Sequence, residues 1–154
     1  MTVASDVLFD EANRSDLDRL VALLGVLFEQ EADFEPDPAK QRRGLELLLK
    51  NPTRGRVFVA RKSGQTAAAV TLQFAISTVE GGETAWVEDV IVDPRHRGAG
   101  IGRGLLAYAI DWARRRGIPR LTLLTDAGNE PAQKLYRSFG FTGSAMVPLR
   151  LYLR

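Results

Sequence analysis

A glycine-rich turn between an apolar strand and a helix constrains this chain more than any other segment. Residues 90–92 are a Val-Ile-Val run, Asp93-Pro94 ends it, and four glycines interleaved with arginines lead into the helical pattern of residues 101–116. Glycines let backbone amides approach a ligand without interference from a Cβ atom. The free amides at a helix N-terminus also carry partial positive charge. The segment therefore predicts an anion-binding cradle suited to phosphate.

Two familiar nucleotide-binding loops do not fit this turn. A Walker A loop ends in Gly-Lys-Ser/Thr, which is missing here. A Rossmann fingerprint requires G-x-G-x-x-G, but the third glycine is misplaced when counted from Gly98, and Leu105 fills its position when counted from Gly100. Asp126 follows the next apolar run, where a Rossmann acid would lie, yet only residues 127–154 remain for the usual larger sheet. An oxidoreductase or kinase with an unusual glycine loop is therefore a weaker alternative.

The order of the remaining elements predicts the fold class. Apolar residues recur at helical spacing from Ser15, with Asp18 completing a capping-box pattern, and again after Asp37-Pro38. Strand patterns cover residues 56–60, 67–76 and 84–92, with an extra strand at 6–10, a buried strand at 121–125 and a last strand at 146–153. Residues 129–139 read as another helix. We expect a single α/β domain over residues 1–154, with a central mixed, mostly antiparallel twisted sheet and helices on both faces.

Composition narrows the function classes. The 154 residues include no cysteine and one histidine, so we expect no disulfide, no cysteine nucleophile and no metal site. A net charge of +2 argues against a dedicated nucleic-acid binder. The first residues lack a basic region followed by an apolar run, and no apolar stretch approaches the ~18 residues that span a bilayer. We therefore expect a cytoplasmic protein with no nucleic-acid or membrane partner.

Two motifs in the second half of the chain resemble those of a known family. Arg97, Gly100 and Gly102 form R-x-x-G-x-G. Downstream, N-x-x-A-x-x-L-Y-x-x-x-G-F is formed by Asn129, Ala132, Leu135, Tyr136, Gly140 and Phe141. In this order and spacing they resemble the GNAT superfamily of N-acetyltransferases, closely over residues 84–141. The resemblance implies a GNAT-like fold and transfer of an acetyl group from acetyl-CoA to a primary amine of a small molecule or peptide, by direct attack in a ternary complex.

The resemblance also implies where coenzyme A binds. Its pyrophosphate would be held by the Arg97 side chain and by the backbone of Gly98, Ala99, Gly100, Ile101, Gly102 and Arg103. The backbone of Val90, Ile91 and Val92 would pair with pantetheine. Asn129, Ala132 and Tyr136 would line the pantetheine groove, since a spacing of seven residues is close to two helical turns. Asn129 also suits a helix N-cap. Arg95 and Arg103 are expected to attract the phosphates.

Catalysis needs a group that takes a proton from the amine and one that gives a proton to the leaving sulfur. In GNAT enzymes the tyrosine that matches Tyr136 is the general acid. Glu88 and Asp89 are the candidates for the base, because a free alkylamine has a pKa of about 10 and must lose a proton before it attacks. Strand alternation sends the two acids to opposite faces, but the family commonly has a β-bulge here. We predict Glu88 as the base, since an acid at this place has that role in several family members, with Asp89 or a water as the alternatives.

The acceptor is less constrained than the donor. In this fold it would be bound by the first two helices, their loop at residues 33–38, and residues 77–83. Five acids would attract a cationic amine such as a polyamine, an aminoglycoside or a lysine-bearing peptide: Glu29, Glu31, Asp33, Glu35 and Asp37. A solvated acidic loop explains them equally well. The alternative function is a non-catalytic acyl-CoA-binding sensor or regulatory domain, against which the tyrosine and the acidic pair count. A homodimer formed through the C-terminal strand fits the family.

Overall fold

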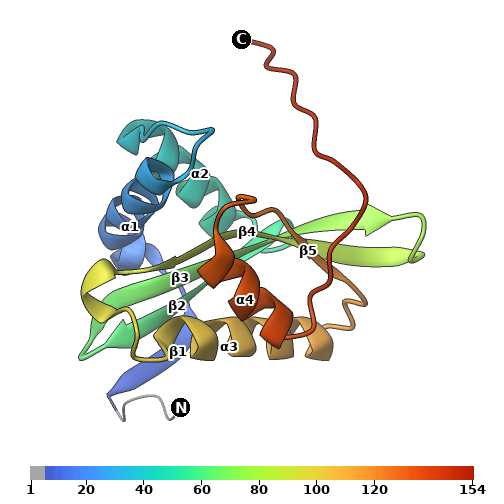
Figure 1. The fold of residues 1–154 in the computed structure, drawn as a ribbon. Coiled ribbons are helices and arrows are strands. Elements are labelled where there is room, and N and C mark those ends of the chain that lie inside the picture. Colours follow the sequence, from blue (N-terminus) through green and yellow to red (C-terminus); the bar gives the residue numbers. More distant parts are fainter. Residues whose placement is uncertain (1–5) are drawn as a thin grey trace.

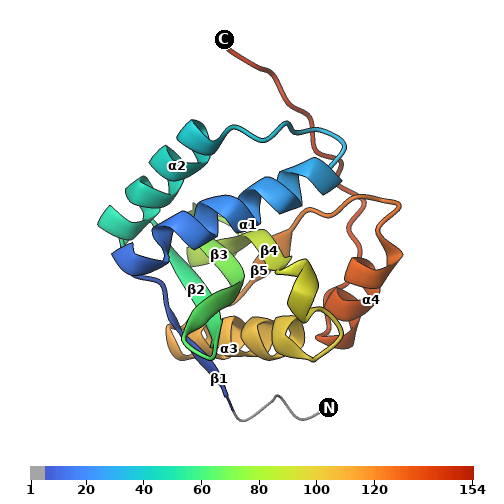
Figure 2. The ribbon, with the colours of Figure 1, turned by 90° about the vertical axis from the view of Figure 1, so that its left-hand side faces the viewer.

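The computed structural model describes residues 6–154, which form one five-stranded sheet with helices on both faces (Figures 1 and 2). The strands lie side by side in chain order: β1 (Val7–Glu11), β2 (Gly55–Lys62), β3 (Gln65–Ser77), β4 (Gly82–Val92) and β5 (Leu121–Leu123). The first four are antiparallel to their neighbours, and β5 is parallel to β4. The predicted α/β class, with a mixed and mostly antiparallel sheet, is confirmed, as is the extra N-terminal strand.

Two apolar cores lie on opposite faces of the sheet. Helices α1 (Leu17–Gln30) and α2 (Pro38–Lys50) cover one face, and α3 (Ile101–Arg115) covers the other (Figure 2). Along β2, Phe58 and Ala60 are buried in the α3 core, whereas Val57 and Val59 are buried in the α1–α2 core. A slip of one residue would exchange the two sets of side chains, so burial on both faces fixes the register.

Side-chain caps set where α2 and α4 (Glu130–Ser138) begin. The Asp37 carboxylate accepts a hydrogen bond from the Lys40 amide at 3.1 Å, and Asn129 accepts one from the Ala132 amide at 3.2 Å. Each cap satisfies an amide that has no acceptor within the helix. Both N-caps were predicted from the sequence, and both are confirmed.

The capping box of the first helix lies earlier than predicted. Asn13 accepts a hydrogen bond from the Ser15 amide, and Asp16 accepts one from the Asn13 amide, each at 2.8 Å. This exchange encloses a short 3-10 helix, η1 (Arg14–Asp16), before α1 begins. The prediction of Ser15 and Asp18 was wrong because the helical turns begin two residues earlier, after the extended backbone of Asn13.

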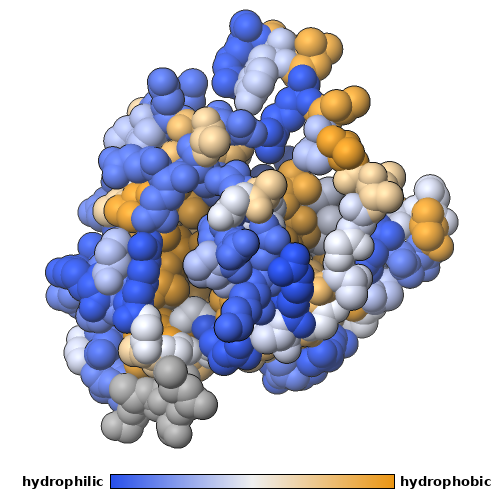
Figure 3. Space-filling model, viewed as in Figure 1, coloured by the Kyte–Doolittle hydropathy of each residue, from blue (hydrophilic) through white to orange (hydrophobic). Residues whose placement is uncertain are grey.

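The predicted last strand at residues 146–153 is not formed. Residues 142–154, all within the described part of the chain, contain no helix or strand, and the segment extends away from the sheet (Figures 1 and 3). Its alternation persists without a partner strand. Leu149, Leu151 and Leu153 are exposed, whereas Tyr152 and Arg154 line a cavity of the domain. The period of two was present in the sequence, but a strand also needs a neighbour to pair with.

Within residues 6–154, no helix combines the length and apolar character needed to cross a bilayer. The same residues contain no group of three or more metal-ligating side chains placed to hold an ion.

A buried ion pair joins the start of α1 to the sheet. Asp16 is 3% exposed and lies 2.7 Å from Arg61 of β2, and it also accepts a hydrogen bond from the Thr66 hydroxyl at 2.7 Å. Burial alone would raise the pKa of Asp16, but hydrogen bonds from Arg61, the Asn13 amide and Thr66 hold that pKa below its usual value. The carboxylate therefore stays charged inside the fold only while these partners are present.

Replacing Arg61 tests this pair. Arg61→Ala should lower the free energy of unfolding by about 3 kcal/mol, because it leaves the Asp16 carboxylate buried without its charged partner. Arg42→Ala is the matched control, since Arg42 pairs with an exposed Asp18 and should cost less than about 1 kcal/mol. Urea unfolding curves measure both. Equal losses in the two variants would contradict the role given to Asp16.

Candidate functional site

Strand β4 contains a β-bulge at its acidic pair. Thr71 of β3 pairs with Asp89, whereas the next residue of β3, Leu72, pairs with Val87. Glu88 is therefore the extra residue on β4. The bulge expected from the family resemblance is present at this position.

The bulge places both acids on the same face of the sheet. Val87 and Val90 both contact the α3 core, although they are three residues apart, and Ile91 contacts the opposite core. In a regular strand, two residues on one face are separated by a single residue. Glu88 and Asp89, which fill the longer gap, consequently both face the α1–α2 side.

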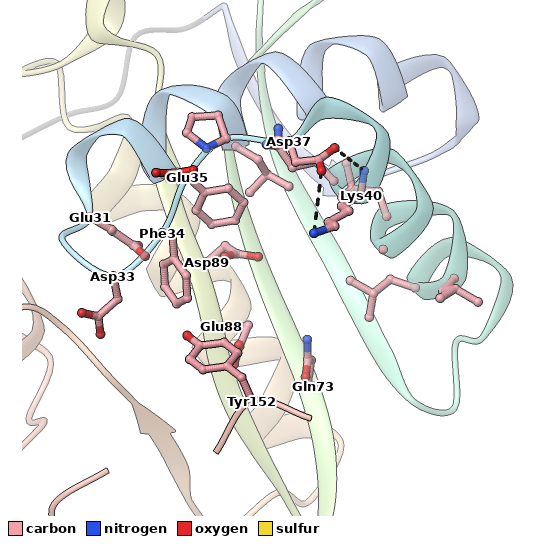
Figure 4. A pocket seen from close by; sticks show the side chains of 18 of the residues that line it. Glu31, Asp33, Phe34, Glu35, Asp37, Lys40, Gln73, Glu88, Asp89 and Tyr152 are labelled. Carbon is pink, nitrogen blue, oxygen red and sulfur yellow. Dashed lines mark hydrogen bonds and ion pairs between the residues drawn. The ribbon is translucent and has the colours of Figure 1, made fainter. Parts of the chain in front are cut away.

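A cavity of about 1040 Å³ lies on this side, between the sheet and the helices α1 and α2 with their connecting loop. Glu88 and Asp89 line it from β4, and Gln73 lines it from β3 (Figure 4). The loop contributes Glu31 and Phe34, and the C-terminal segment adds further residues including Tyr152 (Figure 4). The cavity thus combines carboxylates with aromatic rings.

The acids in this cavity influence one another's protonation. Burial, followed by the charges of Glu88 and Glu31, raises the pKa of Asp89 to about 7, against a partial offset from Thr71. Burial and the charges of Asp126 and Glu88 likewise raise the pKa of Glu31. A carboxyl group with a pKa near 7 exchanges a proton readily at neutral pH.

The far edge of β4 is open beyond the bulge. Strand β5 pairs with β4 only from Ala85 to Val87, and then leaves it. The backbone of residues 88–92 on that side therefore has no strand beside it. One of its acceptors is already engaged, since Arg97 Nε donates to the Val92 carbonyl at 3.2 Å.

The predicted anion cradle follows β4 directly. Gly98 and Gly100 have φ values of 81° and 79°, which L side chains rarely adopt. A Cβ on Gly102 would lie 2.9 Å from Val92 Cγ2, so only glycine lets the helix approach the strand this closely. The first hydrogen bond of α3 runs from the Gly104 amide to the Gly100 carbonyl, which leaves the amides of residues 101–103 without a helical acceptor.

Arg95 anchors the cradle from within. Asp93 is 4% exposed and accepts hydrogen bonds from the Arg95 guanidinium at 2.8 Å, from the Arg95 amide, and from Arg19 of α1 at 2.7 Å. These contacts, led by that of the Arg95 guanidinium, hold the pKa of Asp93 well below its usual range. The Arg95 side chain, expected from the sequence to attract the phosphates, is thus paired with Asp93.

Arg97 and Arg103 connect the cradle to the helices beside it. The Arg97 guanidinium reaches Gln30 at the end of α1, at 3.5 Å. Arg103 donates to Ser138 Oγ at 2.7 Å and lies over the Phe139 ring, 5.1 Å from its centroid. Both contacts are exposed. They bring the end of α1 and the end of α4 next to the cradle.

Tyr136 lies on α4, apart from the residues that line the cavity. Its ring packs edge-on against Phe141 with a centroid distance of 5.9 Å. Burial, and then the charge of Glu31, raises the pKa of Tyr136, so the hydroxyl keeps its proton at neutral pH. Glu31 also lines the cavity, and its charge raises the pKa of both Tyr136 and Asp89. It therefore couples the tyrosine electrostatically to the acidic pair.

Four contributors were not singled out from the sequence: Thr71, Gln73, Asp93 and Tyr152. Thr71 faces Asp89 across the two strands, and Asp93 holds the cradle. Asp93 precedes a proline, and in the sequence this pair indicated only the end of a strand. Tyr152 belongs to the alternating residues 146–153, which were predicted to form a strand of the sheet. Nothing in the sequence therefore indicated that Tyr152 lines the cavity.

Known proteins resemble this chain in sequence and in fold. The sequence model of the Acetyltransferase (GNAT) family matches residues 18–141. A streptothricin acetyltransferase from Streptomyces lavendulae is 43% identical over 67 residues, which are 44% of this chain and 35% of that relative. The chain thus spans about a third of that curated relative's length.

Two solved structures share the fold at low sequence identity. A possible acetyltransferase from Clostridium difficile 630 superposes with a TM-score of 0.85 at 21% identity, covering 96% of this chain and 98% of that one. A predicted acetyltransferase from Clostridium acetobutylicum, solved with acetyl-CoA, superposes with a TM-score of 0.75 at 20% identity, covering 96% of each. At these identities the likeness shows the fold alone.

The raised pKa of Asp89 predicts a stability cost that an asparagine would remove. A carboxyl that favours its protonated form in the folded state stabilises fully below pH 3.8 and loses this contribution as the pH rises through about 7. Asp89→Asn cannot ionise. Its stability relative to the parent should therefore increase by roughly 2 kcal/mol between pH 4 and pH 8.

Urea unfolding at several pH values measures this difference. Asp111→Asn is the control, because Asp111 is 61% exposed and its replacement should change the free energy of unfolding by less than about 0.5 kcal/mol. A pH-independent difference between parent and Asp89→Asn would mean that folding leaves the pKa of Asp89 unchanged.

Proposed function

Because the chain belongs to the acetyltransferase (GNAT) family, we propose that it transfers an acetyl group from acetyl-CoA to a primary amine of a small molecule or peptide. The arrangement of β4 carries this proposal. Its bulge turns two acids into a cavity, its far edge is open, and its end leads into an anion cradle. An anionic donor and an amine acceptor can therefore reach one strand from its two sides.

The cradle suits the pyrophosphate of coenzyme A. The amides of residues 98–103 and the Arg97 guanidinium would hold it, and the amides of residues 101–103 have no helical acceptor that competes for them. The backbone of Val90, Ile91 and Val92 at the open edge would pair with pantetheine, beside the Asn129, Ala132 and Tyr136 face of α4. Acetyl-CoA supplies the acetyl group as a thioester, which is activated toward an amine.

Asp89 is our choice for the base. It lines the cavity, and its pKa of about 7 lets it accept a proton from an alkylammonium far more readily than an ordinary carboxylate does. Glu88, favoured from the sequence, lines the same cavity and remains the competing assignment. For Asp89, burial and then the negative charge of Glu88 raise the proton affinity of the base.

Tyr136 completes the proton balance. The amine nitrogen forms a bond to the acetyl carbon, and the bond from that carbon to sulfur breaks. The amine proton goes to the carboxylate, and the Tyr136 hydroxyl gives its proton to the departing sulfur. The raised pKa of Tyr136 supports this role, because the hydroxyl must be protonated to act as an acid.

Calorimetric titration with acetyl-CoA tests the donor site. Wild-type protein should bind acetyl-CoA in preference to NAD and ATP, and the affinity should weaken with added salt. Gly100→Ala should weaken binding at least about tenfold, because an alanine resists a φ of 79° and shifts the amides. Gly64→Ala is the matched control, with a φ of 80° in a turn between β2 and β3. A folded protein that does not bind acetyl-CoA would disprove the proposal.

Substitution of Tyr136 tests the chemistry separately from binding. Tyr136→Phe should lower kcat about 100-fold with less than about a twofold change in the Kd of acetyl-CoA, since only the proton donor is lost. Thiol release across a panel of primary amines gives the rate. Tyr108→Phe serves as the control, because that tyrosine packs against Phe9 and Phe58 in the α3 core.

The pH profile of the same reaction ranks the two acids. For a base with a pKa near 7, kcat/KM should rise as the pH increases through that value. Asp89→Asn should abolish this inflection, whereas Glu88→Gln should shift it to lower pH by removing a neighbouring negative charge. The reverse outcome would assign the base to Glu88. Acetyl-CoA binding without turnover on any amine would favour a sensor domain.

A further inference from the structure

The cavity contains more negative charge than its own cations balance. Six carboxylates line it, against three cations: Glu31, Asp33, Glu35, Asp37, Glu88 and Asp89, with Lys40, Arg54 and Arg154. Two of the acids are paired, since Lys40 lies 3.8 Å from Asp37 and Arg150 of the C-terminal segment lies 2.7 Å from Asp33. Among the residues that the structure describes, the other four acids form no ion pair.

Three of the unpaired acids, Glu31, Glu88 and Asp89, repel one another. Negative charge from Glu88 disfavours ionisation of both Glu31 and Asp89, and Glu31 in turn disfavours ionisation of Asp89. Crowding of like charges in a partly buried cavity costs free energy that a bound cation recovers. A ligand with one ammonium group neutralises one end of the cluster, whereas a ligand with two neutralises both ends.

Aromatic rings lie among these acids. Phe34 of the loop packs edge-on against Phe28 of α1 at a centroid distance of 5.8 Å, and the Arg150 guanidinium lies 5.4 Å from the Phe34 centroid. This loop ring therefore already contacts a cation. Tyr152 of the C-terminal segment adds a second ring to the lining of the cavity (Figure 4). Rings in this arrangement offer apolar contact to methylene groups and cation–π contact to ammonium groups.

The C-terminal segment limits the size of the acceptor. Arg150 connects this segment to the α1–α2 loop through Asp33 and Phe34, so the two segments bound the cavity together. The surface of a folded protein would have to displace both of them to present a lysine to Asp89. A free small molecule meets no such obstacle.

We infer that the acceptor is a small amine with at least two positive charges separated by an apolar spacer. One amine reaches Glu88 and Asp89, where it is acetylated, and the other is held by Glu31 and Glu35. The spacer contacts the aromatic walls. The inference rests on the proposed function for the acetylation itself, whereas the cation site depends only on the charges and rings of the cavity.

Calorimetry with spermidine as the probe tests the cation site without turnover, on the protein alone and on the protein with excess coenzyme A. Spermidine should bind at least about 50-fold more tightly than n-butylamine, because it places further ammonium groups among the acids. Glu31→Gln and Glu35→Gln should each weaken spermidine binding about tenfold and leave butylamine binding nearly unchanged. Glu46→Gln is the matched control, since Glu46 lies on α2 between two lining residues but does not line the cavity.

The outcomes separate this inference from the proposed function. Equal affinity for spermidine and butylamine, or equal losses in Glu31→Gln and Glu46→Gln, would overturn the dication site even if acetyl-CoA binds and monoamines are acetylated. Tighter binding of a lysine-bearing peptide than of spermidine would overturn the small-molecule assignment. Tight spermidine binding that depends on Glu31, in a protein that does not bind acetyl-CoA, would support the cation site and disprove the acetyltransferase proposal.

Discussion

The extra residue at Glu88 lets β4 stay paired with β3 along its length while two consecutive side chains face the same way. Without it, a regular strand would bury one of the two acids against the α3 core, where an unpaired carboxylate is strongly disfavoured. The pairing with β5 ends at Val87, immediately before the bulge. The orientation of the two acids toward the cavity and the start of the open edge of β4 therefore coincide with one local change in the backbone, the bulge at Glu88.

The contacts of Asp93 hold the anion cradle in place at the end of β4. The carboxylate is buried at the end of β4 and binds Arg19 of α1 and Arg95 of the turn, so the turn cannot move independently of the first helix. Arg103 adds a second connection, from the first turn of α3 to Ser138 of α4. An anion site made of backbone amides depends on such supports, because the amides must point at the ligand before it arrives.

Much of the fold could be predicted from the sequence because its signals are local. The caps at Asp37 and Asn129 and the positive-φ glycines are set by residues within one turn of each other. The site was harder to predict. Period-two alternation cannot reveal a bulge, so it could not rank Glu88 against Asp89, and Glu88 was predicted as the base from the family resemblance alone. The prediction of a last strand was wrong for a related reason. Alternation is a property of a single segment, whereas strand pairing also requires a second segment beside it.

The negative charge in the cavity favours the proposed function but lowers the stability of the fold. Burial, together with the charges of Glu88 and Glu31, keeps Asp89 protonated in the folded chain at pH values where the unfolded chain would ionise it, so the fold is less stable at neutral pH than a neutral side chain would allow. That same strain makes Asp89 a stronger base and makes the cavity more attractive to cations. A cationic amine that enters relieves the repulsion and then gives its proton to the carboxylate. Binding of the acceptor and activation of the acceptor therefore depend on the same uncompensated charge.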